Sequence, residues 1–138
     1  MFKNLIITAI LGLLAIILGA FGAHAFKEIL TSEQLLSFET AVRYQMYHVI
    51  VLLFVNTYEG FLGKQKKLIS TVFFLGIVLF SGSIYLIQLT SITAKTIWFI
   101  TPLGGLFFII GWSLMILIFL KKTSVIVTEA KLNRNLKI

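Results

Sequence analysis

The sequence lacks several residue types that soluble, disulfide-bonded or catalytic domains need. It has no cysteine, which excludes disulfides, thiolate metal sites and cysteine nucleophiles. Only 12% of its 138 residues are charged, about half of what a soluble domain of this size needs to cover its surface. Its five acidic residues form no carboxylate pair within an apolar run, and it has neither a phosphate-binding glycine loop nor a plausible catalytic triad. We therefore expect no enzyme, and the length leaves no room for a second domain.

Apolar residues make up 59% of the chain and are grouped in four runs, at residues 5–23, 46–62, 68–89 and 102–120. Each run, as a helix, matches a hydrocarbon core of about 30 Å, and none contains lysine or arginine. The sequence thus predicts an all-α, integral membrane four-helix bundle over residues 1–122. We expect its helices at about residues 5–23, 44–62, 68–89 and 102–120.

The first run has an alternative interpretation as a secretory signal peptide. Lys3 would form the basic segment, and Ala23, His24 and Ala25 resemble a cleavage site with small residues. The run is longer than the usual apolar segment of about 7–15 residues. We therefore expect an uncleaved membrane helix.

The basic residues are distributed unequally between the two sides of the predicted bundle. Four spans place both termini and the turn at 59–67 on one side, which carries nine of the twelve basic residues. These are Lys3, Lys64, Lys66, Lys67, Lys121, Lys122, Lys131, Arg134 and Lys137, whereas the other side has Lys27, Arg43 and Lys95. This bias predicts that both termini are cytoplasmic. The net charge of +7 therefore indicates a membrane protein, not a nucleic-acid binder, and residues 123–138 should be a loosely ordered basic tail.

The second run carries a stripe of polar residues, and this stripe determines where the other helices are predicted to pack. Gln45, His48, Asn56 and Glu59, with Leu52 between them, fall within an arc of roughly 80° on a helix. Acyl chains do not solvate such groups, so other helices must cover the stripe.

Two further patterns predict how the helices begin and pack. Thr31 and Gln34 fit a capping box, and nothing from Thr31 to Tyr58 breaks a helix, so an amphipathic helical extension should run continuously into the second span. In the first run, small residues share one face and predict a close contact, within the bundle or between subunits. They are Thr8, Gly12, Ala15, Gly19 and either Gly22 or Ala23.

Most other polar residues of the spans are predicted to lie in the outer half of the bundle. Hydrogen bonding between helices would explain them, and so would a small polar pocket for a ligand, ion or proton. The pocket candidates are His24, Gln45, His48, Ser81, Ser83, Tyr85, Gln88 and Thr101.

The two histidines are the sequence's strongest candidates for metal or haem ligands. His24 lies at the outer end of the first span, and His48 is predicted about one turn inside the outer end of the second. Two histidines without a third ligand are too few for a typical metal site, so we predict no metal and no cofactor. Paired with Glu59, His48 would instead be the centre of a proton relay.

Several short motifs, in a fixed order, resemble the signature of a bacterial membrane family. They are G-A-F-G-A-H-A at 19–25, Y-Q-M-Y-H at 44–48, F-S-G-S-I-Y at 80–85, I-T-P-L-G-G at 100–105 and G-W at 111–112. The family is known as domain of unknown function 423 and is similar to the eukaryotic transmembrane protein 256. The resemblance covers about residues 3–120 and implies a small multi-pass inner-membrane protein with no established activity. It also implies that His24, Gln45, His48, Ser81, Ser83, Tyr85, Thr101 and Pro102 belong to the shared pattern.

Two classes of function remain open from the sequence. The first is a structural or accessory membrane protein that acts as a homo-oligomer or as a subunit of an assembly with other membrane proteins. The second is a channel or transporter for a small solute or protons along the stripe from Gln45 to Glu59. Glycine-lined helix faces and short loops favour the first.

Overall fold

The chain folds into four long helices connected by short segments. The computed structural model describes residues 2–135, and that part of the chain contains helices but no strands. The helices are α1 (Phe2–Ala23), α2 (Ser32–Thr57), α3 (Gly63–Leu89) and α4 (Ile100–Asn135), with a short 3-10 helix, η1 (Phe26–Glu28), between α1 and α2. The all-α prediction is confirmed.

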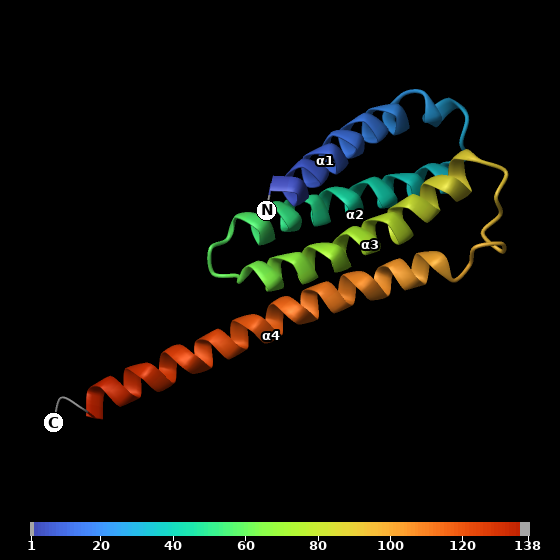
Figure 1. Cartoon of the computed structure of the whole chain (residues 1–138). Coiled ribbons are helices and arrows are strands. Elements are labelled where there is room, and N and C mark those ends of the chain that lie inside the picture. Colours follow the sequence, from blue (N-terminus) through green and yellow to red (C-terminus); the bar gives the residue numbers. More distant parts are fainter. Residues whose placement is uncertain (1, 136–138) are drawn as a thin grey trace.

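The helices lie side by side in chain order, each antiparallel to the one before (Figure 1). The extensive helix–helix contacts join α1 to α2, α2 to α3 and α3 to α4. Side chains of α4 also reach α2, because Phe108 and Met115 belong to the same buried cluster as Leu52. α2 is therefore central, while α1 forms an edge that packs mainly on α2.

Within the described residues, three helices are long and apolar enough to cross a membrane: α1 extended by η1, α3 and α4. α2 has 26 residues, but Gln45, His48 and Asn56 lower its hydropathy. Because α2 packs along both α1 and α3, it lies at the same depth of the bilayer as they do. The structure thus confirms a helical membrane bundle.

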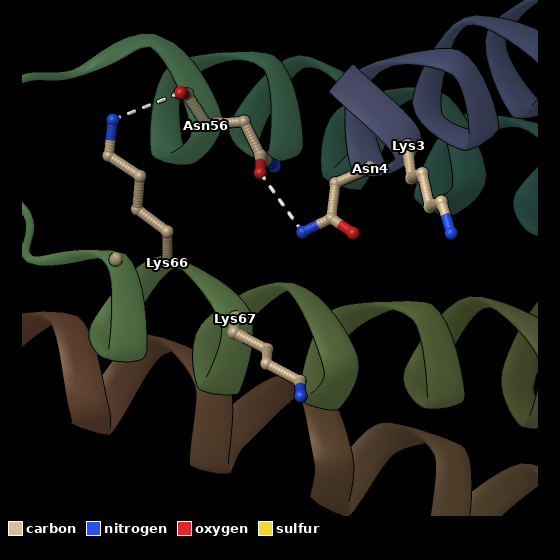
Figure 2. Close-up of a pocket in the computed structure, with 6 residues that line it drawn as sticks. Lys3, Asn4, Asn56, Lys66 and Lys67 are labelled. Carbon is tan, nitrogen blue, oxygen red and sulfur yellow. Dashed lines mark hydrogen bonds between the residues drawn. The ribbon is translucent and has the colours of Figure 1, made fainter. Parts of the chain in front are cut away.

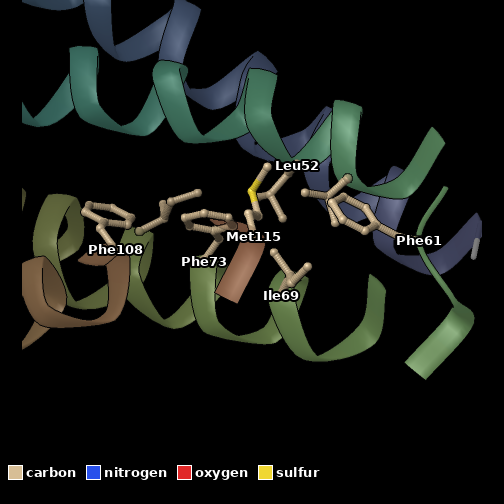
Figure 3. Close-up of a cluster of buried hydrophobic side chains, with 8 residues drawn as sticks. Leu52, Phe61, Ile69, Phe73, Phe108 and Met115 are labelled. Carbon is tan, nitrogen blue, oxygen red and sulfur yellow. The ribbon is translucent and has the colours of Figure 1, made fainter. Parts of the chain in front are cut away.

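The main apolar core lies between α2, α3 and α4 (Figure 3). Its buried members are Leu52, Val55, Phe61, Ile69, Phe73, Ile77, Phe108 and Met115. Ile69 and Phe73 are one helical turn apart on α3 and face Leu52 of α2, as the spacing of four residues on an amphipathic helix requires. This core fixes α2 against α3 and α4, and α1 is held separately.

The small-residue face of α1 packs against α2, as predicted. Thr8, Ala15 and Gly22 are the buried residues of α1. A Cβ atom added to Gly12 would lie 3.2 Å from the Val49 side chain, a tight contact, so the glycine lets this side chain pack closely on α1. The contact lies within the bundle.

This contact also fixes the depth of His48. Its neighbour Val49 meets Gly12, which is halfway along α1, so His48 lies near the middle of the bundle. The predicted position, one turn inside the outer end of the second helix, was wrong. The membrane span of this helix was expected to begin near Tyr44, whereas α2 packs along α1 over residues that precede Tyr44 as well.

α2 begins with the predicted capping box. The Gln34 backbone N–H donates to the Thr31 hydroxyl at 3.3 Å, and the Thr31 N–H donates to the Gln34 side chain at 2.9 Å. The helix then runs unbroken to Thr57, which confirms the continuous extension. It ends before the predicted residue 62, because Tyr58 adopts an extended conformation and its ring covers Gly60, where a Cβ atom would not fit.

α4 is longer at both ends than predicted. It begins at Ile100 instead of residue 102, and it continues past Lys122 to Asn135. The expectation of a loosely ordered tail was therefore wrong for residues 123–135, and 136–138 lie outside the described residues. Residues 121–135 contain neither glycine nor proline, so nothing in their sequence stops the helix. This part of α4 projects beyond the other three helices (Figure 1).

We predict that Gly104→Ala destabilises the protein and that Gly105→Ala does not. A Cβ atom on Gly104 would lie 2.3 Å from the backbone nitrogen of Phe80, so α4 would have to move away from α3. The expected cost is about 1–3 kcal/mol in the free energy of unfolding, measured by denaturant titration in detergent with circular dichroism.

Gly105→Ala is the matched control, because it makes the same change in helix propensity. The nearest atom to its new Cβ would be in the Phe80 side chain at 3.9 Å, an ordinary contact. Equal stability of the two variants would contradict the close approach at Gly104.

Candidate functional site

The other helices enclose the polar face of α2, as the sequence predicted. Gln45, His48 and Asn56 are 3%, 5% and 1% exposed. Leu52, on the same face, is fully buried in the core (Figure 3). Within residues 2–135, no deeply buried side-chain nitrogen or oxygen lacks a hydrogen-bond partner. The stripe is therefore paired inside the protein and does not face hydrocarbon.

Gln45 connects three helices. Its amide nitrogen donates to the backbone carbonyl of Leu11 in α1 at 2.7 Å. Its amide oxygen accepts from the hydroxyl of Tyr85 in α3 at 2.9 Å. Both ends of one side chain are thus used to fix α1 and α3 on opposite sides of α2.

His48 is held in one tautomer by its two partners. Its Nδ1 lies 2.8 Å from the backbone oxygen of Tyr44, and a carbonyl can only accept, so Nδ1 carries the proton. The indole N–H of Trp112 then donates to Nε2, at 3.4 Å. The imidazole also stacks on Phe108, with centroids 3.5 Å apart and planes 5° apart. A neutral imidazole satisfies all these contacts.

The residues on α4 that hold His48 were not singled out as site candidates from the sequence. Phe108 and Trp112 are four residues apart and so share one face of a helix. That spacing is the signal that could have identified them, although it does not say which helix they face.

A cavity of about 740 Å³ opens beside His48. Aromatic and aliphatic side chains dominate its lining, and Ile109 and Ile116 are more than half exposed, so it faces the hydrocarbon. Its lining consists of Tyr44, His48, Phe80, Pro102, Gly105, Leu106, Phe108, Ile109, Trp112, Ser113 and Ile116. Of the predicted pocket residues, His48 is the one that borders this cavity.

Other predicted pocket residues form separate contacts between helices. The hydroxyl of Ser81 donates to the backbone oxygen of Ala41 at 2.8 Å, which joins α3 to α2. The hydroxyls of Ser83 and Thr101 lie 2.6 Å apart, which joins α3 to α4. Gln88 is half-buried near the end of α3. The predicted outer cluster is thus divided into several helix–helix contacts.

Asn56 lies at the other end of the stripe and bonds to three residues absent from the predicted site, of which Figure 2 shows Asn4 and Lys66. Its Oδ1 accepts from the side chain of Asn4 at 3.1 Å, and its Nδ2 donates to the hydroxyl of Ser70 at 2.9 Å. The Lys66 ammonium donates to its backbone oxygen at 3.0 Å. Of these three partners, Asn4 was the easiest to identify from the sequence, because it is a polar amide directly before the first apolar run.

Two predicted site residues lie apart from the buried polar groups. Glu59 follows the end of α2 and is exposed in the turn to α3, so the prediction that it continues the stripe was wrong. His24 is exposed in the turn after α1, at one end of the bundle, and the structure does not bring it to His48 near the middle. In residues 2–135, no group of three or more His, Asp or Glu side chains is arranged to hold a metal ion.

A model of the protein family described as "Protein of unknown function (DUF423)" matches residues 18–105, more than half of the chain. The chain belongs to this family. The match contains α2 and α3, with Gln45, His48 and the serine contacts, but it ends before Trp112. Because the family's function is unknown, membership gives the class of protein and not an activity.

Named relatives in several bacteria support this assignment. A UPF0382 membrane protein of Staphylococcus saprophyticus is 38% identical over 82% of this chain and 92% of its own length. The UPF0382 membrane protein YwdK of Bacillus subtilis is 41% identical over 81% and 91%. The UPF0382 inner membrane protein YgdD of Escherichia coli is 35% identical over 81% and 85%. No solved structure matches the chain.

The bond between Gln45 and Tyr85 gives a double-mutant prediction. Tyr85→Phe removes the donor and should cost about 0.6–1.7 kcal/mol of unfolding free energy in detergent. The same substitution should cost clearly less in a Gln45→Leu background, where the acceptor is already gone. Tyr47→Phe, at a lipid-facing tyrosine of α2, is the control and should change little. Equal costs in both backgrounds would contradict the bond.

The tautomer of His48 gives a spectroscopic prediction. In nitrogen NMR of isotope-labelled histidine at mildly alkaline pH, Nδ1 of His48 should give the frequency of a protonated nitrogen and Nε2 that of an unprotonated one. Trp112→Phe should shift the Nε2 resonance, because the indole donor is lost, whereas Trp98→Phe should leave it in place. The opposite tautomer would contradict the assigned pairing.

Proposed function

We propose that this protein is a non-enzymatic accessory or structural subunit of a membrane assembly, formed with further copies of itself or with other membrane proteins. The observation that carries this proposal is the projecting part of α4. Lys122 donates to the Gly60 carbonyl at the α2–α3 turn, and Val125 and Ile126 still border a cavity with Leu62 and Gln65 at the start of α3. Beyond that turn of helix, no other helix of the described residues lies alongside α4 (Figure 1).

The projecting part of α4 exposes apolar side chains where the hydrophobic span has already ended. Val125, Ile126, Val127 and Leu132 are 50%, 65%, 47% and 59% exposed. Outside the hydrocarbon such a group of side chains is costly in water, so it favours association with another protein.

The orientation that fits this proposal has both termini in the cytoplasm. Lys66 donates to the end of α2 and Lys122 to the turn that follows, so the lysine-rich segments meet at one end of the bundle. Of the eleven basic residues in residues 2–135, eight belong to this side, which supports a cytoplasmic location in the inner membrane.

The alternative function, conduction of a small solute or protons along α2, has less support. Leu52 is fully buried between His48 and Asn56, and Glu59 lies outside the stripe. The polar groups are occupied by hydrogen bonds between helices, which is the arrangement expected of a structural role.

Mass measurement of the protein in native-membrane nanodiscs tests the proposal. We expect the wild type to elute in an assembly larger than one chain. The triple variant Val125→Ala, Ile126→Ala and Leu132→Ala should lose most of this assembly, because its exposed apolar surface beyond the membrane is reduced.

The matched control replaces three exposed apolar residues of α4 within the span, Ile110, Leu117 and Leu120, by alanine. These face lipid and should leave the assembly intact. A wild type that is always a lone monomer, or equal losses in both triple variants, would contradict the proposal.

A further inference from the structure

A second cavity lies at the end of the molecule where α1 and α3 begin and α2 ends. Its volume is about 330 Å³, at the lower end of the range of about 300–1,000 Å³ found for ligand pockets. It exists because α1 and α3 both pack on α2 more than on each other. Its lining consists of Lys3, Asn4, Asn56, Gly63, Lys66 and Lys67.

The charge of this cavity has one sign. Three of its six lining residues are lysines, and no carboxylate lines it. Lys3 comes from α1, whereas Lys66 and Lys67 come from α3 (Figure 2). Lys66 is engaged with the Asn56 backbone oxygen, while Lys3 and Lys67 are exposed. Like charges held around one space repel each other, and an anion between them would remove that cost.

Neutral groups of the cavity are fixed in position. The Asn56 side chain lies between α1 and α3, where it bonds to Asn4 and Ser70 and also donates to the Leu52 carbonyl at 2.8 Å. Gly63 is the first residue of α3, so the positive end of that helix dipole adds to the lysine charge. A Cβ atom on Gly63 would meet nothing within 4 Å, which leaves this side of the cavity open.

The cavity lies at the depth of the lipid headgroups. Lys3 lies two residues before the first apolar run, and Lys67 immediately precedes the third. Phosphate groups of the bilayer lie at this level, and basic pockets between membrane helices on the cytoplasmic side are suited to anionic headgroups.

We propose that this cavity binds a phosphate group, supplied by the headgroup of an anionic phospholipid or by a free phosphate ester. Lys3 of α1 and Lys67 of α3 would hold the phosphate from two sides. The side-chain amides of Asn4 and Asn56 and the first residue of α3, Gly63, would line the rest of the site. This proposal is independent of the assembly proposed above, since it uses the other side of the α2–α3 turn from the exposed part of α4.

Native mass spectrometry of the full chain in detergent, with an equimolar mixture of phosphatidylglycerol and phosphatidylcholine of identical acyl chains, tests the lipid source. Phosphorus NMR titration with inorganic phosphate and glycerol phosphate tests whether a free phosphate binds.

Lys3→Gln and Lys67→Gln should each weaken binding of the phosphate-bearing ligand about fivefold. Circular dichroism confirms that both exposed substitutions leave the fold intact.

The control is Lys64→Gln with Lys121→Gln, which removes the same charge from the same end of the molecule but outside the cavity. A preference for phosphatidylglycerol that is lost in Lys3→Gln/Lys67→Gln and kept in the control identifies a lipid headgroup. The same pattern for the soluble phosphates alone identifies a free ester. Equal binding of both lipids without phosphate binding, or equal losses in the two double variants, would overturn the proposal.

Discussion

Hydrocarbon offers no hydrogen-bond partner, and this constraint determines where α2 must lie. Gln45 bonds to α1 and α3, His48 bonds to α4, and Asn56 bonds to α1 and α3. Each such bond contributes only about 0.6 kcal/mol on average, but an unmade one would cost more. The polar side chains therefore contribute less to net stability than to selecting a single arrangement of helices around α2.

Glycines and aromatic rings complete that arrangement between α3 and α4. The ring of Phe108 lies over Gly76, and the ring of Phe73 lies over Gly111, each closer than a Cβ atom would permit. Because these rings fit against backbone, Phe108 is fixed where it stacks on His48. The histidine is thus positioned by apolar packing as much as by its hydrogen bonds.

Features that depend on local spacing were predictable from the sequence, whereas features that depend on register were not. The capping box at Thr31 and the inward direction of Asn56 follow from positions a few residues apart. The pairing of Asn56 with Asn4 depends on the register of α1 against α2, which periodicity does not encode. The end of α2 depends on the Tyr58 ring closing over Gly60, a contact that residue propensities do not reveal. The separate contacts that the other predicted pocket residues form also depend on the register between helices, which the sequence pattern does not give.

The uninterrupted course of α4 has a mechanical consequence. A helix without a glycine or proline between its projecting end and the membrane transmits displacement as a stiff rod. Its close approach to the α3 backbone at Gly104 holds the opposite end of α4 against the bundle. Trp112, which donates to His48, lies on the same uninterrupted helix as the projecting segment. One continuous helix thus connects the part of the chain beyond the bundle to the residue that contacts the imidazole near its middle.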